Sequence, residues 1–177
     1  MGLFRKIITY PIEIIIFLLA LSSCQQVQTA QKEVKAPSTV VKYDNPASSI
    51  LRGFELPADK KLFITSGLVS LPNDTTAAER TLERYGDTYT QSLGCLKRIE
   101  ELLIEAGLSM SDVVFLRVYV APDPQSNDQH DFQGWFNAYG EYFNNEKNPT
   151  KVARSTIGVA ALARPYLLVE VEAVAVY

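Results

Sequence analysis

Arg154 and Thr156 are the residues of this 177-residue chain whose types and spacing most directly suggest chemistry. Both lie in the run VARSTIGVAAL, residues 152–162, whose composition is typical of a β-strand. Because side chains alternate across a strand, Arg154 and Thr156 share one face and Ser155 points to the other. A guanidinium held among apolar residues is unfavourable unless an acceptor meets it. Arg154 therefore requires a carboxylate partner in the protein or an anionic ligand.

Other kinds of site are limited by the composition. A single histidine, His130, argues against a histidine metal site or a Ser-His-Asp triad, so we expect no metal. With 17 Lys and Arg against 20 Asp and Glu, the net charge of −3 gives no basic surface for nucleic acid. Cys24 and Cys95 lie in very different contexts, and we expect Cys95 to be a small buried thiol.

The N-terminus is predicted to be an export signal. Residues 1–23 have a basic start at Arg5 and Lys6, an apolar run and small residues at the end, as in a secretory signal peptide. The end, LSSC at residues 21–24, resembles the lipobox of bacterial lipoproteins, which implies a lipid anchor on Cys24. Gln25 follows, which in a Gram-negative source implies the outer membrane. We expect a lipoprotein of the bacterial cell envelope that faces the periplasm.

An uncleaved membrane anchor is the alternative for this segment. The run of residues 14–21 is too short to span a bilayer, and a longer run contains Pro11 and Glu13. Residues 24–49 are polar and lack periodicity, so we predict that they form a flexible tether behind the lipidated Cys24.

The folded domain is expected over residues 50–177. Residues 50–56 and 61–66 predict two strands of one hairpin. Asp87 is a suitable N-cap and Gly107 a suitable stop for a helix over 87–106, with an apolar stripe at intervals of three or four. The other expected elements are strands 112–121, 152–162 and 167–176 and an aromatic-rich helix over 131–144, whose stripe we assign to the core.

This order of elements predicts an α+β sandwich with two helices packed on one side of a sheet. The sheet has apolar residues on both faces but only two helices to cover them. We therefore expect subunits to close on one another through the uncovered face.

Five motifs in this order resemble the RidA/YjgF/YER057c/UK114 family of reactive imine/enamine deaminases. They are ITSG at residues 64–67, the helix from Gln91 to Leu108, DVV and VYV within 112–120, ARST and VA within 153–160, and VEVEA at 169–173. The resemblance covers about residues 50–177. It implies a chorismate-mutase-like fold with a mixed sheet, a homotrimer, and clefts between the subunits.

The resemblance also implies roles for particular residues. Arg154 matches the arginine that binds the substrate carboxylate by a two-point salt bridge, and Glu170 matches the glutamate that positions the attacking water. Thr156 lines the cleft, and Ser66 and Gly67 match the loop that helps to hold the substrate. The implied reaction is hydrolysis of small 2-imino acids, derived from enamines such as 2-aminoacrylate, to 2-keto acids and ammonia, without a cofactor.

The chain departs from the family pattern near the expected cleft. Residues 49–53, SILRG, lack the tyrosine that lines the cleft in the family, and Val152 stands in place of a proline. The asparagine of the second helix is replaced by Phe136 or shifted to Asn137. A non-catalytic trimer that binds a small carboxylate or a protein partner is therefore the alternative. In that case Arg154 forms a structural salt bridge with Glu170 across adjacent strands.

Overall fold

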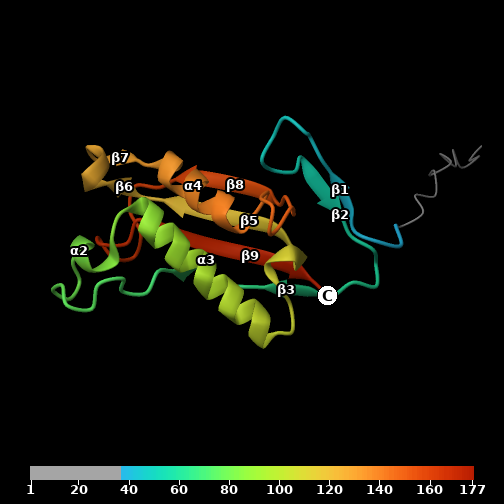
Figure 1. The fold of residues 1–177 in the computed structure, drawn as a ribbon, viewed down its shortest axis with the longest axis horizontal. Helices are drawn as coiled ribbons and strands as arrows, with labels where there is room; N and C mark the ends of the chain where they lie inside the picture. Colours follow the sequence, from blue (N-terminus) through green and yellow to red (C-terminus); the bar gives the residue numbers. More distant parts are fainter. Residues whose placement is uncertain (1–36) are drawn as a thin grey trace, which may run out of the picture. The chain divides into compact units, whose positions relative to one another are not determined.

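A mixed five-stranded sheet forms the centre of the computed structural model, which describes residues 37–177 (Figure 1). The predicted signal peptide, Cys24 and the beginning of the predicted tether lie outside the described residues. The strand order is β3-β9-β5-β8, and β4 also pairs with β9; β5 is antiparallel to β9 and parallel to β8. The bounds are β3 Leu62–Ile64, β4 Leu68–Val69, β5 Val113–Val120, β8 Ala153–Gly158 and β9 Val169–Val176.

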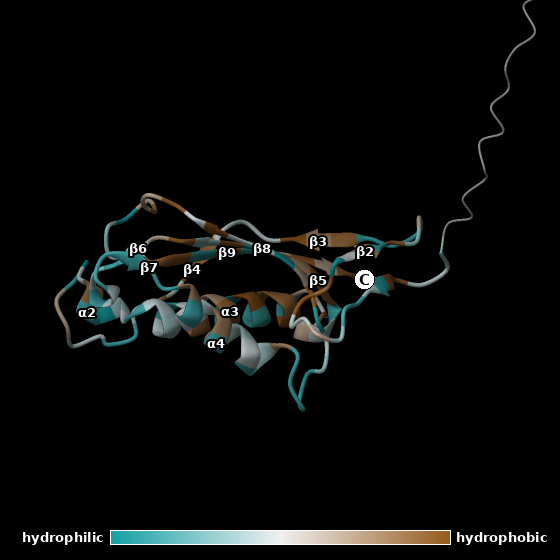
Figure 2. Ribbon diagram, turned by 90° about the horizontal axis from the view of Figure 1, so that it is seen from above, coloured by the Kyte–Doolittle hydropathy of each residue, from teal (hydrophilic) through white to brown (hydrophobic). Residues whose placement is uncertain are grey.

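Two helices, α3 (Thr88–Glu105) and α4 (Phe132–Tyr142), cover one face of this sheet (Figure 2). Asp87 caps α3 by accepting a hydrogen bond from the backbone nitrogen of Thr90 (2.8 Å). Gly107, with φ of 76°, follows its end. The predicted α+β fold, with a mixed sheet and two helices on one face, is thus confirmed. The smaller elements are α2 Leu82–Tyr85, the 3-10 turns η1 Met110–Asp112 and η2 Pro124–Ser126, and the pair β6 Pro122–Asp123 and β7 Gln129–His130.

The core lies between the helices and the sheet. Alternate residues of β5 and β9 face it, as the period of two predicts. The aromatic stripe of α4 enters it through Trp135 and Tyr139, but Phe136 remains 41% exposed. The fully buried side chains of the core include Leu96, Ile99, Leu103, Leu116, Val118, Val120, Trp135, Phe143, Val152 and Leu168.

Within residues 37–177 no helix lies on the other face of the sheet (Figure 2). This face carries an ion pair between Arg117 and Glu172 (3.2 Å) together with exposed apolar residues such as Ile64 and Ile157. It is therefore more polar than the sequence suggested.

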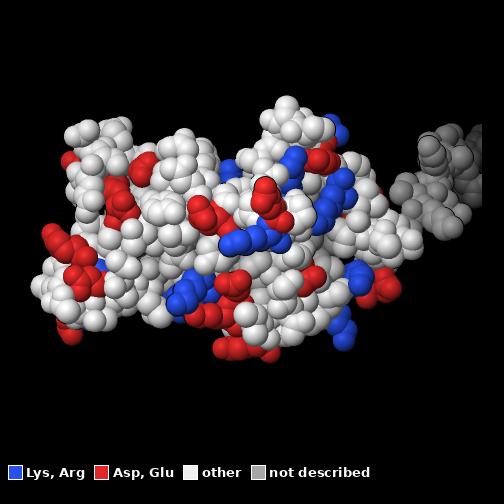
Figure 3. Space-filling model, viewed as in Figure 1, with Lys and Arg blue, Asp and Glu red and all other residues white. Residues whose placement is uncertain are grey.

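On the side of the molecule shown in Figure 3, Lys and Arg side chains lie among Asp and Glu side chains.

The predicted hairpin of residues 50–56 with 61–66 is wrong. The second segment, β3, instead pairs with β9, with Leu62 opposite Val176. The first segment contains β2 (Gly53–Glu55), which pairs with β1 (Val41–Tyr43). Strand β1 lies within the predicted tether, so ordered structure begins before Ile50. Within residues 37–177 no helix has the length and apolar character needed to cross a membrane.

Candidate functional site

Arg154 lies on β8, the edge strand of the sheet, and faces the helices. Its backbone is in register with Leu116 of β5, whose side chain is buried in the core. Three aromatic rings of α4 surround the guanidinium carbon, and their centroids lie 4.5 Å (Tyr139), 5.0 Å (Phe136) and 5.8 Å (Trp135) from it. Aromatic faces attract a cation, so α4 stabilises the charge of Arg154 without supplying a counter-ion.

Three polar atoms are buried here without a hydrogen-bond partner among the described residues: Nη1 of Arg154, Oγ1 of Thr156 and Nε1 of Trp135. Burial lowers the pKa of Arg154, and the nearby Tyr139 opposes this effect, but a guanidinium stays protonated at neutral pH. A buried charged donor without an acceptor is costly. Arg154 and Thr156 therefore form an incomplete site that an anion would complete.

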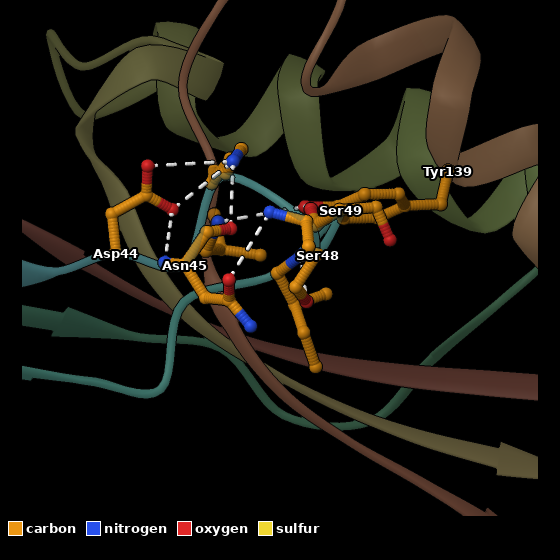
Figure 4. Close-up of polar contacts among 9 residues, drawn as sticks. Asp44, Asn45, Ser48, Ser49 and Tyr139 are labelled. Carbon is orange, nitrogen blue, oxygen red and sulfur yellow. Dashed lines mark hydrogen bonds and ion pairs between the residues drawn. The ribbon is translucent and has the colours of Figure 1, made fainter.

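Tyr139 connects Arg154 to the N-terminal part of the domain. Its hydroxyl donates a hydrogen bond to the carbonyl oxygen of Ser49 (3.0 Å; Figure 4) and accepts one from the backbone nitrogen of Val152 (3.5 Å). Burial raises the pKa of Tyr139, so the hydroxyl remains neutral and keeps its proton as the donor. A salt bridge between Lys151 and Asp44 (3.0 Å) holds the same segment.

Gly67 and Glu170 meet elsewhere on the sheet. Glu170 of β9 pairs with Val69 of β4, and a Cβ built at Gly67 would overlap the carboxylate of Glu170. Thr65 fixes the chain before Ser66 and Gly67, because its backbone nitrogen donates to the Ala173 carbonyl and its hydroxyl accepts from the Ala173 nitrogen. Only a glycine leaves room for Glu170 here.

The predicted site residues thus fall into two groups on opposite faces of one sheet. Arg154 is aligned with Leu116 and then Ala173, on the helix side. Glu170 lies three residues from Ala173 along β9, an odd number, and therefore points to the open face. Three residues along the strand and two strand spacings separate the backbones of Arg154 and Glu170 by roughly 14 Å. The alternative of an Arg154–Glu170 salt bridge across adjacent strands is wrong, because β5 lies between β8 and β9.

The structure decides which residue of α4 faces Arg154. The ring of Phe136 contacts the guanidinium, whereas Asn137 is exposed and accepts a hydrogen bond from Gln133 (2.8 Å). Our sequence interpretation assigned Tyr139 and Trp135 to the core and missed their contact with Arg154. Their spacing was the available signal, since residues three and four apart share one side of a helix.

Replacement of Gly67 by alanine is expected to displace the Glu170 side chain at little cost in stability. The atoms that the new methyl group meets belong to the flexible end of that side chain. If the protein hydrolyses imino acids as the family resemblance implies, we expect the mutant to lose as much of that hydrolysis as Glu170→Gln does, while the thermal midpoint changes little. Gly140→Ala is the control, because a Cβ at Gly140 meets no atom within 4 Å and should stabilise α4 by about 0.5–1 kcal/mol. Full hydrolysis by Gly67→Ala together with a loss in Glu170→Gln would contradict this contact between Gly67 and Glu170.

Cys95 is a buried thiol, as predicted, and contributes no nucleophile. It is 0% exposed, and burial raises its pKa to about 12. The folded protein therefore binds the thiol proton more tightly than the unfolded chain does. This contribution to stability is fully present below about pH 9 and is lost as the pH rises toward 12.

The corresponding prediction concerns stability in alkali. Between pH 9 and 12 the free energy of unfolding should fall by a few kcal/mol, at about 1.4 kcal/mol per pKa unit. Cys95→Ala should show a shallower fall, because only the thiol contribution is removed. Chemical denaturation of both proteins at several pH values measures the difference. Identical slopes would show that folding does not raise the pKa of the Cys95 thiol.

The fold defines the protein as a small α+β domain. Its edge strand β8 carries an arginine, Arg154, whose buried Nη1 has no partner among the described residues. A family model described as Endoribonuclease L-PSP matches residues 58–177. The chain therefore belongs to this family, the RidA/YjgF/UK114 family.

Individual relatives agree with this assignment. A RutC family protein of Pyrococcus abyssi (strain GE5 / Orsay) is 36% identical over 90 residues, which are 51% of this chain and 62% of that protein. The chain thus spans less than two thirds of this curated relative. Two solved structures have a similar fold. One is a conserved Rid family protein of unknown function, YyfB, from Yersinia pestis, with a TM-score of 0.57, 24% identity and coverage of 78% and 99% of the two chains. The other is TdcF of E. coli with bound serine, with a TM-score of 0.51, 21% identity and coverage of 80% and 99%.

Proposed function

We propose that this chain forms a homotrimer that hydrolyses small 2-imino acids to 2-keto acids and ammonia in clefts between its subunits. The observation that carries the proposal is the buried Nη1 of Arg154, which has no partner among the described residues. A substrate carboxylate is the ligand whose two oxygens match a guanidinium. TdcF, which has a similar fold, was solved with serine, a ligand that carries a carboxylate.

The positions of the two groups support the proposed assembly. Arg154 and Glu170 face opposite sides of the sheet, so one chain cannot bring both to the same small ligand. A cleft between two subunits can, if Arg154 comes from one chain and Ser66, Gly67 and Glu170 come from the next. The uncovered sheet face carries exposed apolar residues that such an interface would bury.

The chemistry in this cleft requires positioning more than activation. Arg154 holds the carboxylate, and Glu170 orients a water molecule and accepts its proton. The water oxygen bonds to the C2 carbon of the C=N group. The nitrogen takes up both protons of the water, one of them returned by Glu170, the bond from C2 to nitrogen breaks, and ammonia leaves while the water oxygen becomes the keto oxygen. We propose no metal or cofactor.

The alternative is a trimer that binds a carboxylate or a protein partner without turnover, and the observation that favours it is Phe136 beside Arg154. An assay separates the two. An amino-acid oxidase generates 2-iminopropionate, and its disappearance is followed with and without the protein. The deaminase proposal requires a rate above spontaneous hydrolysis that increases with protein concentration. An unchanged rate would leave the binding function.

We also propose that the protein is a lipoprotein anchored to the cell envelope through Cys24. The sequence LSSC at residues 21–24 supports this location. Globomycin should block processing, and labelled palmitate should be incorporated into the wild type but not into Cys24→Ala. A Cys24→Ala protein that remained equally membrane-bound would contradict the lipid anchor.

A further inference from the structure

Phe136 is an apolar side chain that remains 41% exposed while its ring lies 5.0 Å from the guanidinium carbon of Arg154. The other two rings around this carbon, Trp135 and Tyr139, are 0% and 2% exposed. Phe136 is thus the ring that offers open apolar surface next to the incomplete site. Such surface is unfavourable in water, and a ligand that covers it would gain affinity.

The opposite direction along β8 is already occupied. Arg154, Thr156 and Gly158 follow one another on the helix side of the strand. His130 covers Gly158, because a Cβ there would lie 3.0 Å from its ring, and Nε2 of His130 lies 3.1 Å from the Val159 carbonyl oxygen. A ligand held by Arg154 therefore finds apolar surface toward Phe136 and not beyond Thr156.

We infer that Phe136 determines the specificity of this site, which takes carboxylates with branched or aromatic apolar side chains in preference to those with a methyl group. The inference rests on the proposed binding of a carboxylate by Arg154. A larger apolar side chain can lie on the exposed ring, whereas a methyl group covers little of it. Differences of a few methylene groups in an apolar site change affinity or kcat/KM by about tenfold or more.

Trp135 supplies a binding readout that does not depend on turnover. It is the one tryptophan of the chain, and its ring lies 5.8 Å from the guanidinium carbon of Arg154. Its fluorescence can be titrated with pyruvate and with 4-methyl-2-oxopentanoate, two stable 2-keto acids that differ only in the side chain. We expect the branched acid to bind the wild type about tenfold more tightly.

Three variants complete the experiment. Phe136→Ala should bring the two affinities close together, and Phe136→Leu should keep most of the preference because it retains apolar surface. Ile104→Ala, which removes a 65% exposed side chain from α3, should leave the preference unchanged. Circular dichroism and sedimentation confirm that each variant keeps its fold and its assembly.

The outcomes are distinct. Equal affinities in the wild type, or an unchanged preference in folded Phe136→Ala, would overturn the inference. Dissociation of Phe136→Ala into smaller species would overturn it too, because the ring would then serve a subunit contact. Selective binding without hydrolysis of any imino acid would reject the deaminase and keep the specificity. If neither keto acid binds, the inference fails together with the carboxylate site.

Discussion

Arg154→Ala is expected to lower kcat/KM for 2-imino acids by about 100-fold or more, since each hydrogen bond to a charged group is worth about 1.5–3 kcal/mol and a carboxylate takes two. The same substitution should change the thermal midpoint little, because the loss of the contacts with the rings of α4 opposes the removal of an unfavourable buried group. Among residues 37–177 the buried Nη1 has no partner, so its removal eliminates an unfavourable group. A residue that matters for function but not for stability is expected to show this combination.

Arg154→Lys is the informative comparison. Lysine keeps the positive charge but cannot form a two-point contact, so we expect it to recover only part of the lost rate. Steady-state kinetics and thermal unfolding of the wild type and both variants measure the two effects. A large loss of stability in Arg154→Ala with unchanged kinetics would show instead that the arginine is structural.

Mixed trimers should recover activity that neither parent has. Arg154→Ala subunits retain Glu170, and Glu170→Gln subunits retain Arg154. If each cleft takes the two residues from neighbouring chains, an equal random mixture restores both in about one quarter of the clefts. We expect activity near that fraction of the wild type after co-expression or joint refolding.

This experiment tests whether each cleft takes Arg154 and Glu170 from different chains. If both residues came from the same chain, every subunit in the mixture would lack one of them and activity would not return. Native mass spectrometry must show that mixed trimers have formed. Their complete inactivity would contradict a cleft built from two subunits. A matched mixture of Arg154→Ala with the double variant Arg154→Ala/Glu170→Gln should remain inactive, since no subunit in it supplies Arg154.

Local patterns in the sequence were sufficient for most elements. The N-cap Asp87, the apolar stripe and Gly107 predicted α3, and strict alternation predicted β5, because both signals depend only on neighbouring residues. The prediction that Arg154 requires an anion also rested on its apolar surroundings alone. The resemblance to the family added Glu170, Ser66 and Gly67 as the other predicted site residues.

Strand pairing was decided by tertiary structure. Residues 50–56 and 61–66 are close in sequence and have the composition of a hairpin, yet β2 pairs with β1 and β3 pairs with β9. A short strand carries little information about its partner, because any edge with free backbone groups can satisfy its hydrogen bonds. For the same reason the sequence did not show that β5 lies between β8 and β9. The separation of Arg154 from Glu170 follows from this order and could not be predicted either.

The sequence by itself predicted that Arg154 needs an anion. It also determined which residues form the helices and the central strands, and that the chain resembles this family. The tertiary structure alone decided that Arg154 lies under the rings of α4 and that Phe136 is open beside it. It also decided that Glu170 points to the opposite face of the sheet. These facts depend on which strands become neighbours and in what register, and such contacts between distant residues leave no periodic signal in the chain.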